Sequence, residues 1–189
     1  EAIRGAKILV GGRRALLDFA LPGQVTMTID RDIEKVLTFI EDAAKDADVT
    51  VMVSGDPGFY SFLDTLRKRF PRGKIVVIPG ISSLQYAFAR LALPWHRAHL
   101  LSFHGRTPAL EELAYDEAGL WGFLSDAKFH SGKVAQTLLA HGFPPNCQMF
   151  ICQRLSYEDE RIRCVTLGEA ALTEGKNAVL IVRGEKPYD

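Results

Sequence analysis

The sequence lacks several features that would place it in a class at once. No apolar run among its 189 residues approaches the roughly 18–20 residues of a membrane-spanning helix, and we expect no signal peptide. Lysine plus arginine equals aspartate plus glutamate at 23 each, so no net charge draws the chain towards nucleic acid or a membrane surface. Cysteine is scarce, with Cys147, Cys152 and Cys164 spaced without a C-x-x-C pattern. We therefore expect a cytoplasmic protein without disulfides, in which these cysteines are buried structural thiols; zinc is chemically possible, but no ligand set has metal-site spacing.

Common nucleotide and hydrolase motifs are missing as well. No expected strand is followed by G-x-G-x-x-G or by a Walker A lysine, and the nucleophile-elbow pattern G-x-S-x-G does not occur. An ordinary dinucleotide site, a P-loop and a serine-hydrolase elbow are therefore unsupported. What is present is the composition of an ordinary globular protein, 47% hydrophobic and 24% charged.

The first half of the chain alternates strands with helices. Residues 1–4 are typical of the last turn of a helix. Apolar runs predict strands at 7–10, 25–29, 48–53, 74–78 and 99–103, and helical spacing predicts helices at 31–45, 59–70 and 82–91. The run at 48–53 is apolar enough for a central parallel strand covered on both faces. This alternation predicts an α/β lobe built around a parallel sheet.

The second half predicts a different lobe. Residues 107–119 are less regular and mark the expected junction, which gives an N-terminal lobe at 1–106 and a C-terminal lobe at 107–189. Strands are expected at 120–124, 148–152, 161–167 and 178–183, with a helix at 132–141. The last two strands are joined by a short segment that favours antiparallel pairing, so we expect a mixed sheet in this lobe.

Two loops of the first half carry polar groups directly after expected strands. One is at 54–60, where Asp56 is suited either to accept hydrogen bonds from a ligand or to cap the helix that follows. The other is at 79–85, where Ser82 and Ser83 offer hydroxyls and free backbone amides, or serve as helix caps. Since the carboxyl ends of parallel strands meet at one edge of a sheet, both loops should open on the same edge.

At these loops the sequence resembles the tetrapyrrole (precorrin) methylase family, within it the branch that methylates C5 of precorrin-6Y or its cobalt counterpart. The motifs that carry the resemblance occur in the family's order over nearly the whole chain: Gly11-Gly12-Arg13-Arg14, Ser54-Gly55-Asp56-Pro57, Pro79-Gly80-Ile81-Ser82-Ser83, Ala89-Arg90-Leu91 with Pro94-Trp95, Ser102-Phe103-His104-Gly105-Arg106, and Gln153-Arg154-Leu155-Ser156 followed by Asp159-Glu160-Arg161-Ile162. Members of this family begin with a further strand and a Gly-Pro loop, which do not precede the first residues here.

The resemblance implies a two-lobed α/β enzyme that uses S-adenosylmethionine, releases S-adenosylhomocysteine and usually forms a homodimer. It also implies a corrin precursor as the substrate and a decarboxylating C15-methyltransferase as a partner enzyme. Carried over by position, the cofactor-binding residues are Gly55, Asp56, Phe59, Tyr60, Ser82, Ser83, Leu124, Gln153 and Ala178.

The chemistry of methyl transfer adds further candidates. A sulfonium methyl is already activated, so the protein has to supply orientation and a dry site rather than a nucleophile. His104 is suited to act as a base, because imidazole titrates near neutral pH, or it makes a structural hydrogen bond. Arg13, Arg14 and Arg106 are candidates for gripping the substrate's carboxylates.

Three alternatives stay open at this stage. A sibling methylase of the same fold acts at another ring position, on a translation factor or on RNA, although the neutral charge gives RNA little support. A non-catalytic module binds a tetrapyrrole or a partner enzyme. A generic α/β domain binds phosphate groups.

Overall fold

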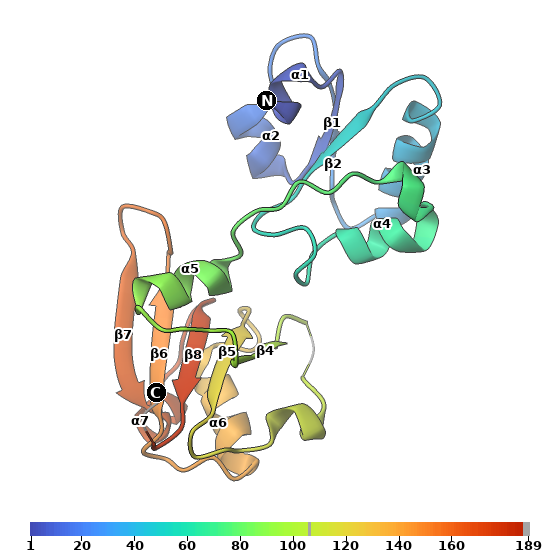
Figure 1. The fold of residues 1–189 in the computed structure, drawn as a ribbon. Coiled ribbons are helices and arrows are strands. Elements are labelled where there is room, and N and C mark those ends of the chain that lie inside the picture. The colour runs from blue at the N-terminus through green and yellow to red at the C-terminus, as the bar shows by residue number, and fades with distance from the viewer. Residues whose placement is uncertain (106, 187–189) are drawn as a thin grey trace. The chain divides into compact units, whose positions relative to one another are not determined.

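The computed structural model describes residues 1–105 and 107–186, and within them the strands form two separate sheets (Figure 1). The chain divides into two compact units, Glu1–Ser82 and Ser83–Asp189. This division differs from the expected boundary after residue 106. The reason is strand β4, His99–Ser102, which pairs with β5, Leu120–Leu124, and thus belongs to the second sheet.

The first unit contains a parallel sheet in the order β2-β1-β3. Its strands are β1 (Ile8–Gly11), β2 (Val25–Thr28) and β3 (Val49–Met52), and its helices are α1 (Ala2–Gly5), α2 (Arg13–Phe19), α3 (Ile33–Ala43), α4 (Leu63–Arg69) and the 3-10 helix η1 (Arg72–Lys74). Val36 and Ile40 of α3 are buried against Val10 of β1, with Met27 and Val51 packed beside them. Helical spacing in α3 therefore builds this small core, as the sequence predicted.

Two expectations about this sheet were wrong. Strand β3 is an edge strand of the sheet rather than its centre, because β1 pairs with both β2 and β3. Residues 75–80 join neither sheet within the described part of the chain. Val76 is 92% exposed and Ile78 is 61% exposed, and this apolar run pairs with no strand among the described residues.

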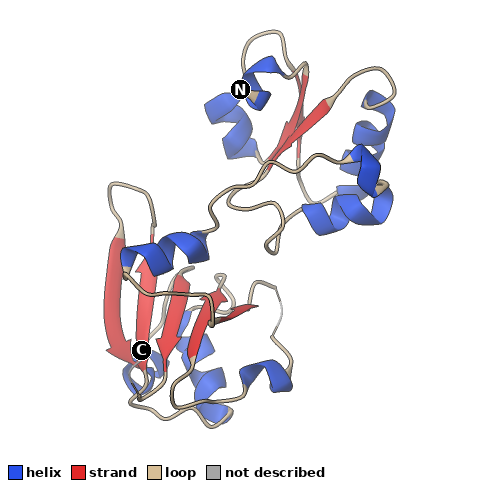
Figure 2. Ribbon diagram, viewed as in Figure 1, coloured by secondary structure: helices blue, strands red, loops and turns tan. Residues whose placement is uncertain are grey.

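The second unit contains a mixed sheet in the order β4-β5-β8-β6-β7. Its further elements are α5 (Ser83–Arg90), the 3-10 helix η2 (Leu110–Leu113), α6 (Ser131–Ala140), β6 (Gln148–Gln153), β7 (Arg161–Thr166), α7 (Leu167–Ala171) and β8 (Val179–Arg183). Figure 2 shows helices on both faces of this sheet. The prediction of a parallel N-terminal sheet followed by a mixed sheet is confirmed.

A large apolar core fills one side of the second sheet. Trp121, Phe103 and Phe123 are fully buried there against Val134 and Leu138 of α6. On the other side, α5 lies so close to β5 that a Cβ on Gly122 would come within 2.7 Å of the side chain of Leu84. Trp121 is thus a packing residue, whereas Trp95 is 41% exposed.

Details of this unit correct two further expectations. The last two strands are not direct neighbours in the described sheet: β6 lies between β7 and β8 and is antiparallel to both. Cys147 and Cys152 are buried as predicted, but Cys164 on β7 is exposed. Burial raises the pKa of Cys152 to about 12, which makes it an unreactive thiol.

Among the described residues, no helix has the length and apolarity that crossing a membrane requires.

Candidate functional site

The loop at 54–60 contacts Gly80 of the loop at 79–85, although the second loop does not follow a strand of the sheet as expected. Asp56 Oδ1 accepts a hydrogen bond from Gly58 N at 2.8 Å, and Asp56 Oδ2 accepts one from Gly80 N at 3.3 Å. The backbones are in close contact, because a Cβ on Gly80 would lie 3.2 Å from the carbonyl carbon of Gly55. Gly55 has a φ of 75°, a left-handed conformation that glycine adopts without strain. Asp56 therefore holds together two loops that leave neighbouring parts of the unit.

The aromatic residues at the end of the 54–60 loop lie outside the helix. The predicted helix starts at Leu63 rather than at residue 59, and Phe59 and Tyr60 form an edge-to-face pair with ring centroids 4.9 Å apart. Tyr60 has a φ of 48° and is 41% exposed. A left-handed tyrosine is strained, and such strain is frequent where side chains face ligands.

The candidate serines and arginines flank helices. Ser82 is buried, and the exposed Ser83 is the first residue of α5. Arg13 and Arg14 are exposed at the start of α2, directly after β1. Because β1 and β3 are parallel, these arginines follow the same edge of the sheet as the Asp56 loop. Arg14 pairs with Asp18 across 3.7 Å, an exposed pair that contributes little to stability.

In the second unit, one edge of the mixed sheet brings together the other cofactor candidates. Leu124 at the end of β5 is the register partner of Val179 at the start of β8, and Val179 is also the partner of Cys152 on β6. Ala178 and Gln153 are adjacent in sequence to these partners. Since β8 runs against β5 and β6, its first residues lie at the edge where those strands end. Three residues far apart in sequence, Leu124, Gln153 and Ala178, thus share one edge.

Ser125 supports this edge and was missed by the sequence analysis. Its buried Oγ donates to Ala178 O at 2.6 Å and accepts from Ala178 N at 3.0 Å. Both backbone groups of Ala178 are therefore satisfied by one side chain. The signal that could have found Ser125 is its position directly after an apolar run, the same signal that identified Asp56.

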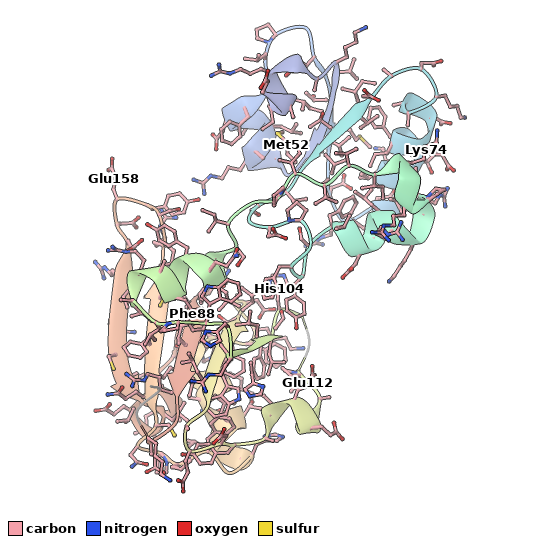
Figure 3. The ribbon with its side chains drawn as sticks, in the orientation of Figure 1. Met52, Lys74, Phe88, His104, Glu112 and Glu158 are labelled. Carbon is pink, nitrogen blue, oxygen red and sulfur yellow. The ribbon has the colours of Figure 1, made fainter. Side chains whose placement is uncertain are left out.

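His104 lies on the loop that follows β4 (Figure 3). Its side chain is exposed, and its backbone N donates to Ser102 Oγ at 3.1 Å. The next amide, Gly105 N, donates to Asp126 Oδ2 at 2.7 Å. Ser102 is the register partner of Leu124, so this loop leaves the same edge as the Leu124 group. Arg106 lies outside the described residues.

Asp126 is a second residue that the sequence analysis missed. Its carboxylate accepts backbone hydrogen bonds from Phe129, Gly105 and Lys128, and these, together with the nearby His104, hold its pKa below the ordinary value although partial burial opposes them. Asp126 is therefore ionised at neutral pH. Within the described ranges, no three His, Cys, Asp or Glu side chains converge as metal ligands.

The structure thus consists of α/β units with polar loops where parallel strands end, the arrangement in which such folds bind small molecules. The family model described as Tetrapyrrole (Corrin/Porphyrin) Methylases matches residues 1–171. The chain therefore belongs to the tetrapyrrole methylase family, as the sequence motifs suggested.

Individual relatives agree with this assignment. The chain is 33% identical over 182 residues to the cobalt-precorrin-7 C(5)-methyltransferase of Salmonella typhimurium, covering 96% of this chain and 89% of that protein. Its fold is similar to the precorrin-6Y methylase of Archaeoglobus fulgidus, with a TM-score of 0.72, 23% identity and coverage of 98% and 88% of the two chains. It is also similar to the uroporphyrin-III C-methyltransferase of Thermus thermophilus complexed with S-adenosylhomocysteine, with a TM-score of 0.73, 21% identity and coverage of 97% and 83%. The two solved structures confirm the fold.

Proposed function

We propose that the protein transfers the methyl group of S-adenosylmethionine to C5 of a cobalt-precorrin in cobalamin biosynthesis. The observation that carries this proposal is the similarity, over 96% of the chain, to a relative named as the C5-methyltransferase of cobalt-precorrin-7. The family is a methyltransferase family, which makes the chain an enzyme of this type. We also propose that the protein forms a homodimer in the cytoplasm and that it works beside a decarboxylating C15-methyltransferase.

The described loops fit the cofactor chemically. Gly55 and Gly80 present backbone without side chains, so a ligand can approach closely, and the oxygens of Asp56 keep lone pairs beyond the two amides they already bind. Phe59 and Tyr60 add aromatic surface beside them. The proposed cofactor-binding residues are therefore Gly55, Asp56, Phe59, Tyr60 and Ser82 of the first unit, and Ser83, Leu124, Gln153 and Ala178 of the second.

The protein's task in this reaction is positioning. Bound S-adenosylmethionine would supply a methyl group that is already activated, as a sulfonium, for transfer to an electron-rich carbon of the ring. The loops then hold the reacting groups in line and exclude water. In this proposal His104 accepts the proton that leaves the methylated carbon, and Arg13, Arg14 and Arg106 bind carboxylates of the macrocycle.

Calorimetric titration with S-adenosylhomocysteine tests the cofactor site. We expect Asp56→Ala to weaken binding at least tenfold, about 1.4 kcal/mol, because it removes both the polar contact and the link between the two loops. Asp64→Ala, which removes the same charge from an exposed position in the first turn of α4, is the matched control. Equal affinity for wild type and Asp56→Ala would remove the first unit's loops from the site.

Transfer itself is measured with labelled S-adenosylmethionine and cobalt-precorrin-7, with mass spectrometry of the macrocycle to locate the added methyl group. A product methylated at another position would identify a sibling methylase. Binding of S-adenosylhomocysteine without transfer to any corrin precursor would identify a binding module instead.

A further inference from the structure

We propose that Asp126 is a positioning residue for methyl transfer: its carboxylate ties the loop that carries His104 to the turn that follows β5. The proposal rests on the function proposed above. Its basis is a set of hydrogen bonds in the second unit that join two loops at one edge of the mixed sheet.

The turn after β5 is built on one oxygen of Asp126. Oδ1 accepts from Lys128 N at 2.8 Å and from Phe129 N at 2.7 Å, which closes a tight turn between β5 and α6. The ring of Phe129 in turn packs against buried Phe103, with centroids 5.9 Å apart. The carboxylate is thus fixed from its own side by the backbone and by the core.

The other oxygen reaches the neighbouring loop. Oδ2 accepts from Gly105 N at 2.7 Å, a short bond to a charged acceptor. Gly105 has a φ of 71°, a left-handed conformation that glycine adopts without strain. In this conformation Gly105 N donates to the carboxylate of Asp126. The adjacent amide, His104 N, is held by Ser102 Oγ, so two successive amides of the loop are bound by side chains.

The charge of Asp126 suits this role. The amides bound to the carboxylate, above all Phe129 N, keep the pKa of Asp126 below its ordinary value. The carboxylate therefore stays ionised at neutral pH. Because the His104 side chain is exposed, its position depends on its backbone rather than on packing. A residue that accepts a proton in the reaction needs its direction fixed, since small displacements are costly in rate.

Asp126→Asn separates the two functions of the carboxylate. An asparagine keeps one oxygen, and the amides of Lys128 and Phe129 hold that oxygen towards the turn. The side-chain NH2 then faces Gly105 N, donor against donor, so the loop is released while the turn stays. Asp116→Asn is the matched control, because Asp116 accepts from Ala118 N within its own turn of the same unit.

Two readouts test the proposal. Hydrogen exchange of the Gly105 amide, followed by NMR, should accelerate at least tenfold in Asp126→Asn and stay unchanged in Asp116→Asn. In the methyl-transfer assay, kcat should fall at least tenfold with the KM for S-adenosylmethionine changed less than threefold. Ser102→Ala frees the His104 amide without touching Asp126 and should also lower kcat. This variant tests the positioning of the loop if Asp126→Asn does not fold.

The outcomes are distinct. Unchanged exchange at Gly105 would overturn the link between the loops, and faster exchange with wild-type kcat would overturn its role in the reaction. A wild-type protein that binds S-adenosylhomocysteine but transfers no methyl group would overturn the proposed function, and the role in transfer with it, while the exchange rates still decide whether Asp126 holds the loop.

Discussion

Gly80 is a position in the first unit with no room for a side chain. A Cβ added there would fall well inside van der Waals contact with the carbonyl oxygen of Gly55, 3.2 Å from its carbonyl carbon and 3.7 Å from Asp56 N. All three are backbone atoms, which cannot rotate aside as the end of a side chain can. Gly80→Ala must therefore push the two loops apart by about 1 Å and weaken the bond from Gly80 N to Asp56, a distortion on the scale at which misplacement costs catalysis.

The expected magnitude follows from overpacking. Inserting a methyl group into a tightly packed site costs about 1–3 kcal/mol, and if that cost falls on the bound loop conformation, S-adenosylhomocysteine binds about tenfold or more weakly. Calorimetry and thermal unfolding of Gly80→Ala are compared with Gly73→Ala, where the added Cβ has nothing within 4 Å. If Gly80→Ala keeps the wild-type affinity for S-adenosylhomocysteine and the wild-type stability, the contact between Gly80 and the Gly55 backbone has no role in cofactor binding, which refutes this prediction.

Two other predictions concern the second unit. Ser125→Ala leaves both backbone groups of Ala178 buried without their partner, so the free energy of unfolding should fall by about 1–3 kcal/mol in urea titrations; a loss below 0.5 kcal/mol would mean that water replaces the hydroxyl. Burial raises the pKa of Tyr115 to about 12, so between pH 10 and 12 the unfolded chain loses this proton while the folded chain keeps it, and stability falls as pH rises. Tyr115→Phe should make that fall shallower, and an equal slope in both proteins would contradict the assignment.

Local patterns predicted most elements of this fold because helices and strands leave periodic traces. Val36, Leu37 and Ile40 are buried on α3 as their spacing indicates. The predictions that failed concern which strands pair with one another, not where the helices and strands lie along the chain. The run at 74–78 has the composition of a strand, but a strand requires a neighbour for its amides, and no residue in the run reports whether that neighbour exists. For the same reason the apolar run of β3 did not reveal an edge position.

The candidate site shows the same limit. Asp56 was identified because it is a polar residue in a loop after an expected strand, whereas Gly55 was carried over from the resemblance to the methylase family. Ser125 and Asp126 occupy the same kind of position after β5 as Asp56. Their meaning depends on which strands end at one edge. In the second unit this depends on β8, which runs against β5 and so places Ala178 beside Leu124. Strand direction in a mixed sheet is a property of the whole fold, and the sequence pattern did not contain it.

The two aspartates share one construction, which strengthens the argument for each. Asp56 binds Gly58 N in its own turn with one oxygen and Gly80 N of the next loop with the other. Asp126 does the same with the amides of its own turn and with Gly105 N. Each carboxylate thus converts two separate loops at the end of a sheet into one fixed surface. Since the proposed reaction requires orientation more than acid–base power, a pair of such links is the support that it needs from the fold.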